Sequence, residues 1–397
     1  MNSIILVPEK VERINSEQVR RCTITRMDDN VQIDQRQLWF QFSDKIVPPE
    51  DSDCDSYLLA MLMDAMAEGR SIIVKGSVSK QLLSNLVEYQ AIWNKWLPNV
   101  YRLIEISVDS IREKDEQVAG AICAFSGGVD ATFSVWRHTQ KKNSYRTQTI
   151  NLCAFVQGFD IPLTDDNAFY SAKKRAEETL SDVGLSLESI KTNFTEVSSA
   201  SWEHSHGCAL VAALSNFKLA AGICVVGSSD PYSALNMSWG STPVADHLLS
   251  SESFDVLHDG ASHTRPEKVD AIALWSVGVN NLRVCWEGDV KDKNCGHCEK
   301  CLRTQFNFLA SGKVIPRCFP VSNIEEIVFE RMMILKNDGR RAEWSQILEY
   351  ANLNNIKSPW VTQLDKIINE KSLIEVIFPE GSLRRKLIRK TLRVCEK

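Results

Sequence analysis

The chain has 397 residues, of which 44% are hydrophobic and 24% charged, and its formal net charge is −5. This composition is typical of a globular protein of about two or three domains and excludes disorder over most of the chain. The negative balance argues against non-specific binding to nucleic acid. The chain contains no run of about 18 apolar residues, so no membrane-spanning helix is predicted. Residues 1–10 lack the features of a secretory signal, so we expect a cytoplasmic protein.

Residues 1–115 are predicted to form an accessory α+β domain. Its strand candidates alternate polar and apolar β-forming residues, and its helix candidates repeat apolar residues every three or four positions. The predicted elements are strands at 21–26, 37–42 and 71–75 and helices at 54–68 and 80–96. The pattern suggests no chemical role for this segment.

Residues 116–312 have the pattern of an α/β domain with a doubly wound parallel sheet. Three strand candidates, at 118–125, 152–156 and 223–227, are apolar, as parallel strands buried on both faces are. Helix candidates fall near 129–141, 166–184 and 206–221. This alternation favours right-handed crossovers and a parallel sheet with helices on both faces. Residues 313–397 are predicted to be a helical C-terminal region.

A glycine turn follows the first of these strands and opens a helix. The chain reads Phe-Ser-Gly-Gly-Val-Asp-Ala-Thr from residue 125. Gly127 and Gly128 allow the backbone to approach a ligand closely, and successive N–H groups at a helix N-terminus favour an anion such as phosphate. We expect Ser126 and Thr132 to donate hydroxyl hydrogen bonds to phosphate, and Asp130 to share a Mg²⁺ ion with it. A strand-to-helix turn without a ligand is the alternative.

The turn resembles the PP-loop of the ATP pyrophosphatase superfamily, whose members carry Ser-Gly-Gly-x-Asp-Ser after the first strand. Four residues match this motif: Ser126, Gly127, Gly128 and Asp130. Ala131 stands where serine is usual. The resemblance implies a HUP-like fold and an ATP site that includes Val129 and Thr132 beside the matched residues. In that superfamily ATP is cleaved between the α- and β-phosphates, and the substrate receives AMP.

Four cysteines form a second motif, with the spacing C-x9-C-x2-C-x2-C. They are Cys285, Cys295, Cys298 and Cys301. Four thiolates at this spacing can surround Zn²⁺ as a tetrahedron, with Gly296 easing the turn of the knuckle, and such a closed site is structural. In a reducing compartment a metal site is favoured over disulfides. An iron–sulfur cluster and unmetallated thiols are the alternatives.

Together, the turn and the cysteines resemble the 7-cyano-7-deazaguanine synthase (QueC) family. That enzyme uses ATP and ammonia to turn 7-carboxy-7-deazaguanine into a nitrile through an adenylated carboxyl group. The resemblance covers about residues 118–310 and is loose between the two motifs. Residues 1–115 and 313–397 have no counterpart in the compact enzyme. The chain is therefore similar in build to the enlarged QueC-like proteins of bacterial antiviral operons, the QatC and CBASS-associated types.

Further site residues are predicted where later strands end, because doubly wound sheets bind ligands at that edge. One loop resembles the substrate loop of the family and contains Ser228, Ser229 and Asp230. Lys268 is similar to a lysine that reaches pyrophosphate in PP-loop enzymes, and Arg265 is a weaker candidate for that role. Asp160 ends the second strand, where these enzymes hold adenine or ribose. Plain capping turns and a solvated helix start are the structural alternatives.

The C-terminal end, from Arg384 to Lys397, is predicted to be a basic amphipathic helix. It suits a phosphate backbone or an acidic partner, but a solvated face is the interpretation we favour. The expected partners are a small-molecule carboxylate and a protein docked on the N-terminal or C-terminal region. Nucleic acid is not favoured, and no membrane partner is expected.

The predicted function is that of an ATP-dependent ligase or synthase with ATP, Mg²⁺ and Zn²⁺ as cofactors. It adenylates a carboxylate, for which a 7-deazaguanine-type acid is the candidate, and an amine then attacks to form a carbon–nitrogen bond. Asp130 and Lys268 are the candidate catalytic residues. One alternative is a tRNA thiolation enzyme, which needs a free cysteine such as Cys153 or Cys208. The other is a non-catalytic nucleotide-binding subunit of an antiviral complex, which Ala131 suits.

Overall fold

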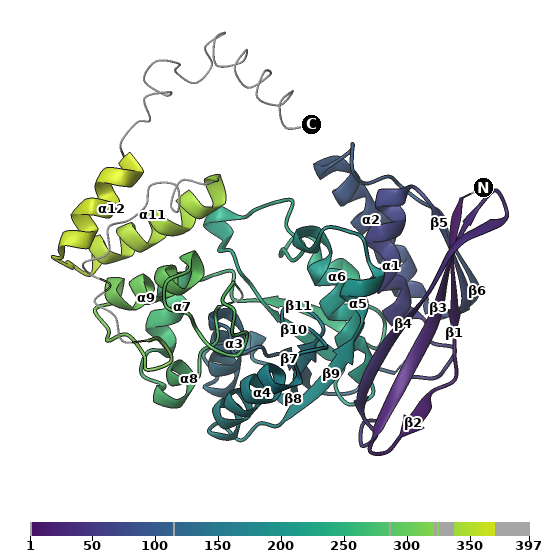
Figure 1. Cartoon of the computed structure of the whole chain (residues 1–397), viewed down its shortest axis with the longest axis horizontal. Helices are drawn as coiled ribbons and strands as arrows, with labels where there is room; N and C mark the ends of the chain where they lie inside the picture. Colours follow the sequence, from purple (N-terminus) through teal and green to yellow (C-terminus); the bar gives the residue numbers. More distant parts are fainter. Residues whose placement is uncertain (1, 114–115, 286, 321–323, 325–336, 370–397) are drawn as a thin grey trace, which may run out of the picture. The chain divides into compact units, whose positions relative to one another are not determined.

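The computed structural model describes residues 2–113, 116–285, 287–320, 324 and 337–369 (Figure 1). The chain divides into two compact units, Met1–Ser322 and Asn323–Lys397. The predicted basic helix at the C-terminal end lies outside the described residues and stays a prediction.

A mixed sheet of 11 strands runs through the first unit in the order β11-β10-β7-β8-β9-β4-β3-β1-β5-β6, with β2 paired to β3. The strands are β1 (Ser3–Pro8), β2 (Glu12–Ile14), β3 (Glu17–Asp28), β4 (Val31–Ser43), β5 (Ser71–Ser79), β6 (Ile106–Arg112), β7 (Ala121–Ala124), β8 (Ile150–Gln157), β9 (Leu187–Thr192), β10 (Ile223–Gly227) and β11 (Asp255–Asp259). The run from β11 to β9 is parallel throughout, whereas β4, β3 and β1 are joined by antiparallel pairing. The α/β class with a mostly parallel sheet agrees with the sequence analysis.

Strand β9 joins the N-terminal strands to the parallel ones. It pairs in parallel with β8 and antiparallel with β4, so that Phe42 lies opposite Ile190. Strand β9 has no clear sequence signal, because Leu-Glu-Ser-Ile-Lys-Thr is short and mostly polar, and it was not predicted. Residues 1–115 and 116–312, taken above as two domains, therefore contribute to one sheet and one compact unit.

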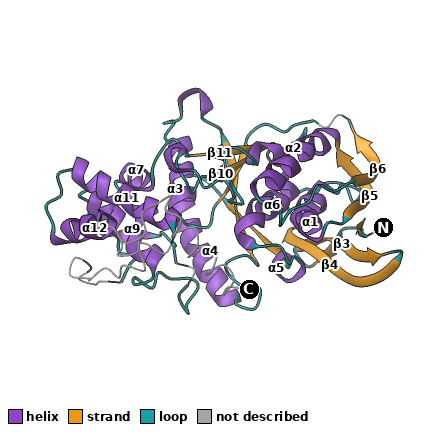
Figure 2. Cartoon of the chain, turned by 90° about the horizontal axis from the view of Figure 1, so that it is seen from above, coloured by secondary structure: helices purple, strands orange, loops and turns teal. Residues whose placement is uncertain are grey.

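Helices cover the parallel strands on both sides (Figure 2). The helices of the first unit are α1 (Asp55–Glu68), α2 (Lys80–Trp96), α3 (Val129–Thr139), α4 (Asp166–Ser181), α5 (Phe194–Val197), α6 (Trp202–Leu214), α7 (Arg265–Ile272), α8 (Ser276–Asn280) and α9 (Glu299–Ala310). Consecutive residues of a strand point to opposite faces. In β7, Ile122 accordingly packs into the core that α1, α2 and α6 share, and Cys123 into the core under α3 and α4.

The second unit contains α11 (Asp338–Leu353) and α12 (Pro359–Asn369) among its described residues. The Asn337 side chain caps α11 by accepting a hydrogen bond from the Arg340 amide, because a helix leaves its first N–H groups without backbone partners. Trp344 of α11 and Trp360 of α12 are fully buried. The helical prediction for this region therefore agrees with the structure over residues 338–353 and 359–369.

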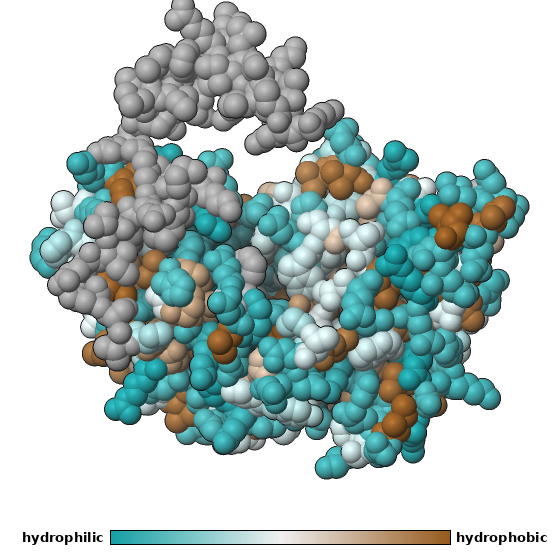
Figure 3. All heavy atoms as spheres, viewed as in Figure 1, coloured by the Kyte–Doolittle hydropathy of each residue, from teal (hydrophilic) through white to brown (hydrophobic). Residues whose placement is uncertain are grey.

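On the face shown in Figure 3, hydrophilic residues predominate and hydrophobic residues lie in separate small groups. Exposed apolar side chains such as Val31, Leu103 and Leu274 belong to different parts of the first unit. Scattered apolar residues of this kind are ordinary on protein surfaces. Among the described helices, none combines the length and apolar character that a membrane crossing requires.

Candidate functional site

The glycine turn lies at the carboxyl end of β7, directly before α3. Gly127 has a φ of +79°, a left-handed backbone conformation that residues other than glycine rarely adopt. Gly128 precedes the first residue of α3. The carbonyl oxygen of Gly127 accepts a hydrogen bond from the backbone N–H of Arg283 at 2.8 Å. The Arg283 side chain donates from Nε to the carbonyl oxygen of Ser126 at 3.3 Å. Both carbonyl groups of the turn are thereby held on the Arg283 side.

The amides of the turn face the other way. In a trans peptide the C=O and N–H groups point in opposite directions, so the N–H groups of Gly127 and Gly128 point away from Arg283. Within the described part of the chain these two amides have no acceptor. Helix α3 also lacks a side-chain cap, whereas Ser79, Asp165 and Thr264 cap α2, α4 and α7. Free amides at a helix N-terminus form a site for an anion.

Asp130, in the first turn of α3, is held by two cations of α7. Its carboxylate accepts from Arg265 Nη2 at 2.8 Å and from Lys268 Nζ at 3.0 Å. The capping box of Thr264 and Glu267 starts α7 at Arg265, and the spacing of three places both cations on one face. Burial alone would raise the pKa of Asp130, but the charges of Arg265 and Lys268 outweigh it and hold that pKa below its usual value.

The first turn of α3 packs closely on the end of β10 because Gly227 has no side chain. A Cβ atom on Gly227 would lie 3.0 Å from both the carbonyl carbon and the carbonyl oxygen of Asp130. Lys268 completes this corner by donating to the carbonyl oxygen of Ser228. Burial lowers the pKa of Lys268, although Asp130 acts in the opposite direction. The ends of β7 and β10 and the start of α7 therefore meet at one point.

Two further features concern cationic groups near Asp130: an N–H of Arg265 without a hydrogen-bond partner in the described structure, and a lowered pKa at Lys300. The Nε atom of Arg265 is buried and has no hydrogen-bond partner in the described structure. Lys300 lies on α9 and interacts electrostatically with Asp130 and Asp160. Burial, helped by the charges of Arg265 and Arg303, lowers the pKa of Lys300 to about 8. This edge of the sheet thus collects positive charge beside the free amides of the turn.

The loop after β8 reaches the same edge through Asp160. Its carboxylate accepts from Arg283 Nη2, and its side chain is 36% exposed. The Arg283 guanidinium also lies 5.4 Å from the centre of the Phe155 ring and donates to the carbonyl oxygen of Lys291 at 3.2 Å. Arg283 therefore connects the loops that follow β7 and β8.

The remaining predicted nucleotide residues differ in access. Ser126 is exposed, whereas Thr132 is 1% exposed and Val129 packs in the core with Phe133, so only the backbone of Val129 is placed to face the turn. The structure therefore gives no exposed hydroxyl at Thr132 for phosphate.

The predicted substrate residues form a tight turn after β10. Ser228 Oγ is buried and donates to the carbonyl oxygen of Asp230 at 2.6 Å, a local capping bond. Ser229 is exposed, and Asp230 is half-buried. Burial raises the pKa of Asp230, and the Asp130 charge acts in the same direction. Ser229 and Asp230 remain accessible candidates at this edge, while Ser228 contributes chiefly its carbonyl group.

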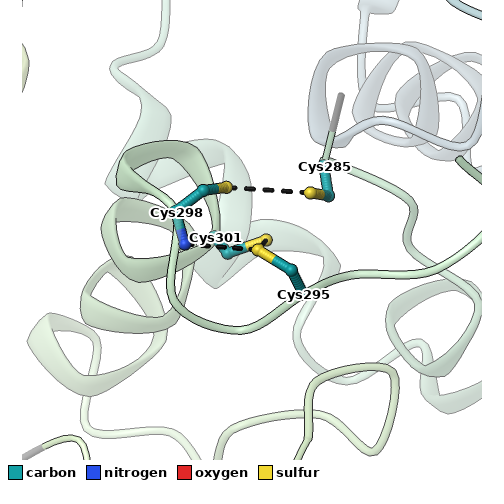
Figure 4. A group of neighbouring side chains, drawn as sticks. All are labelled: Cys285, Cys295, Cys298 and Cys301. Carbon is teal, nitrogen blue, oxygen red and sulfur yellow. Dashed lines mark hydrogen bonds between the residues drawn. The ribbon is translucent and has the colours of Figure 1, made fainter. Parts of the chain in front are cut away.

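The four predicted cysteines come together (Figure 4). Their sulfur atoms all lie within 4.8 Å of one another. Cys285 and Cys298 Sγ are 3.7 Å apart, and Cys295 and Cys301 Sγ are 3.8 Å apart. A tetrahedron with Zn–S bonds of about 2.3 Å has edges of about 3.8 Å. These two distances fit zinc, and the set is a candidate metal site.

Local geometry supports the knuckle. Gly296 has a φ of +83°, and a Cβ atom there would lie 3.0 Å from Pro320 Cδ. The amide of Cys298 donates to Cys295 Sγ at 3.2 Å, and the amide of Gly288 donates to Cys285 Sγ at 3.3 Å. Such bonds stabilise thiolates, the form that binds a metal. Among the described residues, no second group of three or more potential ligands is placed to hold a metal.

Sequence reasoning missed Arg283, Lys300 and Asn294. Arg283 interrupts an apolar stretch, Leu-Arg-Val, two positions before Cys285, and this was the one available signal. Lys300 and Asn294 lie within the cysteine motif, where a single sequence gives no reason to separate them from other polar residues.

Comparisons of the chain with family models, curated proteins and solved structures find no match.

Proposed function

We propose that the chain is an ATP-dependent enzyme that forms AMP and pyrophosphate while adenylating a carboxylate, which an amine then attacks. The observation that carries this proposal is the pair of free amides at Gly127 and Gly128, at the N-terminus of α3 and beside Arg265 and Lys268. Amides, a helix N-terminus and two cations together suit a polyphosphate anion. The buried N–H of Arg265 Nε, which lacks a partner in the described residues, supports an anionic ligand at the same place.

The chemistry needs positive charge where pyrophosphate leaves. A carboxylate oxygen of the substrate attacks the α-phosphorus of ATP, a new phosphorus–oxygen bond forms, and the bond to the β-phosphate bridging oxygen breaks. Lys268, Arg265 and the turn amides stabilise the charge that develops on pyrophosphate. An amine nitrogen then attacks the acyl carbon and AMP leaves, so the first product is an amide.

The residues fit Mg²⁺ only in part. Both oxygens of Asp130 accept from cations, so a bound ion would share this carboxylate with Arg265 and Lys268. Mg²⁺ usually binds through one or two carboxylates plus phosphate and water, which Asp130 and ATP could supply together. Bound there, it would neutralise charge on the leaving phosphates. The cysteine site has no open position for substrate when it holds Zn²⁺, and its role would be structural.

The thiolation alternative is less well supported. Cys208 is fully buried and donates to the Tyr89 hydroxyl at 3.1 Å, and burial raises its pKa to about 12. A thiol that stays protonated and enclosed is a poor sulfur carrier. Cys153 is also fully buried.

The decisive test is an incubation of the protein with ATP and a panel of carboxylates that includes 7-carboxy-7-deazaguanine. We expect AMP and pyrophosphate, formed only when the right acid is present, and chromatography measures both. A Ser126→Ala/Asp130→Ala double variant should lose this activity, while Lys75→Met, at an exposed ion pair far along the chain, should keep it. ADP and orthophosphate as products would contradict the proposal. Unchanged biological activity of the double variant would favour a non-catalytic subunit.

A further inference from the structure

We propose that Arg283 is a positioning residue that connects the glycine turn to the cysteine centre and thereby makes polyphosphate binding depend on that centre. The inference rests on the proposed function, because it concerns the same turn. It goes further in assigning the cysteine centre a second role besides holding its own loop.

The first step is the orientation of the turn. Arg283 is the residue that holds both carbonyl groups, with its backbone N–H on Gly127 and its Nε on Ser126. Each of these bonds fixes one peptide plane, and each peptide plane directs the next amide away from Arg283. Without them the planes can rotate, and the amides of Gly127 and Gly128 no longer converge on one anion.

The second step is the rigidity of Arg283 itself. Its side chain is 4% exposed, and its guanidinium is engaged by Asp160, by the carbonyl oxygen of Lys291 and by the Phe155 ring. A planar group with donors in a fixed fork suits such a position, whereas a lysine offers a compact point charge without that fork. Arg283 can therefore act as a fixed support for the turn.

The third step leads from Arg283 to the cysteines. The amides of Val284 and Cys285 donate to Asn294 Oδ1 at 2.9 Å and 3.2 Å. Asn294 Nδ2 in turn donates to the carbonyl oxygens of Leu282 at 2.8 Å and Cys318 at 3.1 Å. Asn294 directly precedes Cys295 in the chain. The segment 282–285, which carries Arg283, thus ends in Cys285 and is also hydrogen-bonded to Asn294, the residue before Cys295.

The consequence is a physical path from the cysteine centre to the phosphate site. A metal would fix Cys285 and Cys295 relative to each other, Asn294 would keep the segment 282–285 in place, and Arg283 would orient the turn. Loss of the metal should free Cys285 and Cys295 to move relative to each other. Anion binding should then weaken at the glycine turn, although the turn contributes no metal ligand.

The test measures pyrophosphate and ATP binding by calorimetry on the full chain, with the zinc content of each sample. We expect Arg283→Met to weaken pyrophosphate binding at least tenfold with one zinc per chain retained, and Arg283→Lys to restore part of the affinity. Asn294→Ala should act in the same direction. Asn280→Ala, at the end of α8 just before this segment, removes the acceptor for the Arg317 amide and should leave binding unchanged.

Hydrogen exchange provides a readout that does not depend on activity. Exchange at the Arg283 amide, which donates to the Gly127 carbonyl oxygen, should accelerate in Asn294→Ala, and in wild-type protein as a chelator removes the metal. If both arginine variants and Asn294→Ala bind pyrophosphate like wild type, the inference fails while the proposed function stands. If Arg283→Met does not fold, Asn294→Ala and the chelator titration decide the matter. Wild-type protein that binds neither pyrophosphate nor ATP would overturn the proposed function, and this inference with it.

Discussion

Two clusters of charged residues in the first unit use the same chemistry in different ways. One surrounds Asp130 at the carboxyl edge of the parallel strands. The other lies between the N-terminal strands and η2 (Ser215–Phe217), where Lys218 contacts both Asp53 and Asp55. The side chains of these three residues are 5%, 7% and 3% exposed. The carboxylates of Asp130 and Asp160, by contrast, are 19% and 36% exposed.

The inner cluster is closed by further donors. Arg20 donates to the carbonyl oxygen of Asp53 at 2.7 Å and to Asn216 Oδ1 at 2.8 Å, and Arg112 pairs with Asp53 at 3.2 Å. The Ser79 amide donates to Asp55 at 2.9 Å. Its members come from β3, the start of α1, β5, β6 and the end of η2. We infer that this cluster joins residues 1–115 to the parallel half of the sheet.

Burial of charge alone therefore does not identify a ligand-binding site. A closed cluster, whose members satisfy one another, contributes to stability and specifies one arrangement of the chain. The open cluster at Asp130 lies beside free amides and a buried arginine N–H without a partner in the described residues. Mutations in a closed cluster should therefore lower the free energy of unfolding, whereas mutations in the open cluster should weaken ligand binding.

The largest effect should come from the cysteine centre, which is also closed. Cys298→Ser removes one of four ligands, so we expect loss of bound zinc and a fall in unfolding free energy of several kcal/mol, because structural zinc sites couple metal binding to folding. Metal analysis and thermal unfolding measure both. Cys318→Ala, at a cysteine outside the set, should retain one zinc per chain. A brown protein with iron, or full stability without metal, would contradict this expectation.

The inner charge cluster should give the next largest effect. Lys218→Met leaves Arg112 as the remaining ion-pair partner of the buried Asp53 and Asp55 among the described residues, with Arg20 nearby on the Asp53 carbonyl oxygen. Breaking a buried pair in this way costs about 3–5 kcal/mol. Urea unfolding measures the loss. Lys75→Met, which breaks an exposed pair with Asp109, should cost less than about 1 kcal/mol. A small effect at Lys218 together with weakened ATP binding would reverse the comparison.

Asp259 tests whether a carboxylate at the sheet edge affects stability or ligand binding when it is buried and paired with neighbouring side chains. It ends β11, at the same edge as the glycine turn, but its side chain is only 2% exposed. Ser134 Oγ donates to it at 2.8 Å, and His138 and Arg137 lie 3.6 Å and 3.5 Å away. Burial would raise the pKa of Asp259, yet His138, Arg137 and Ser134 together lower it. We therefore expect Asp259 to behave as a closed group.

The sign of its pH dependence follows from that lowered pKa. A carboxylate with a pKa below its unfolded value of about 3.9 stabilises the fold above that pH, and the contribution is lost as the pH falls through the folded pKa. Asp259→Asn weakens hydrogen bonds to a charged group and should thus cost about 1.5–3 kcal/mol at neutral pH. The gap to wild type should shrink when unfolding is measured at progressively lower pH below about 4. Asp109→Asn, at an exposed position, should show no such gap.

The sequence predicts the turns and strands better than it predicts the contacts between them. Runs of apolar residues locate β7, β8 and β10, and the Gly-Gly pair and the cysteine spacing locate both motifs, because these signals are local. Strand β9 and its pairing with β4 depend on residues roughly 150 positions apart, which no local pattern records. For this reason a domain boundary is predicted at 115/116 although the sheet continues across it.

The same limit applies to the site. Asp130 and Lys268 were predicted, and the structure brings them into contact. Arg283 and Asn294 act mainly by hydrogen bonding to backbone groups of other segments. Residue type alone does not reveal which backbone groups a side chain or amide will contact. Thr132 was predicted to face phosphate, but its place inside α3 buries it, which follows from the helix register rather than from the motif.

The smallest stability effect should separate backbone strain from binding. Gly127 and Gly184 both have a left-handed φ, +79° and +73°. A Cβ atom on Gly184 would meet nothing within 4 Å, and one on Gly127 would make only an ordinary contact at 3.7 Å with Arg283. An alanine at either position should therefore cost a similar amount, about 1–2 kcal/mol, from backbone strain alone.

Their effects on a polyphosphate should differ, because only Gly127 contributes a free amide to the open cluster. Gly127→Ala shifts the peptide planes that direct the amides of Gly127 and Gly128, so we expect pyrophosphate binding to weaken at least tenfold, about 1.4 kcal/mol or more. Gly184→Ala should bind as wild type despite an equal loss of stability. Calorimetry and urea unfolding on the two variants measure the two quantities separately. If stability and affinity fell in parallel in both variants, the turn would be an ordinary strand-to-helix connection, and the contrast between closed and open clusters would no longer hold.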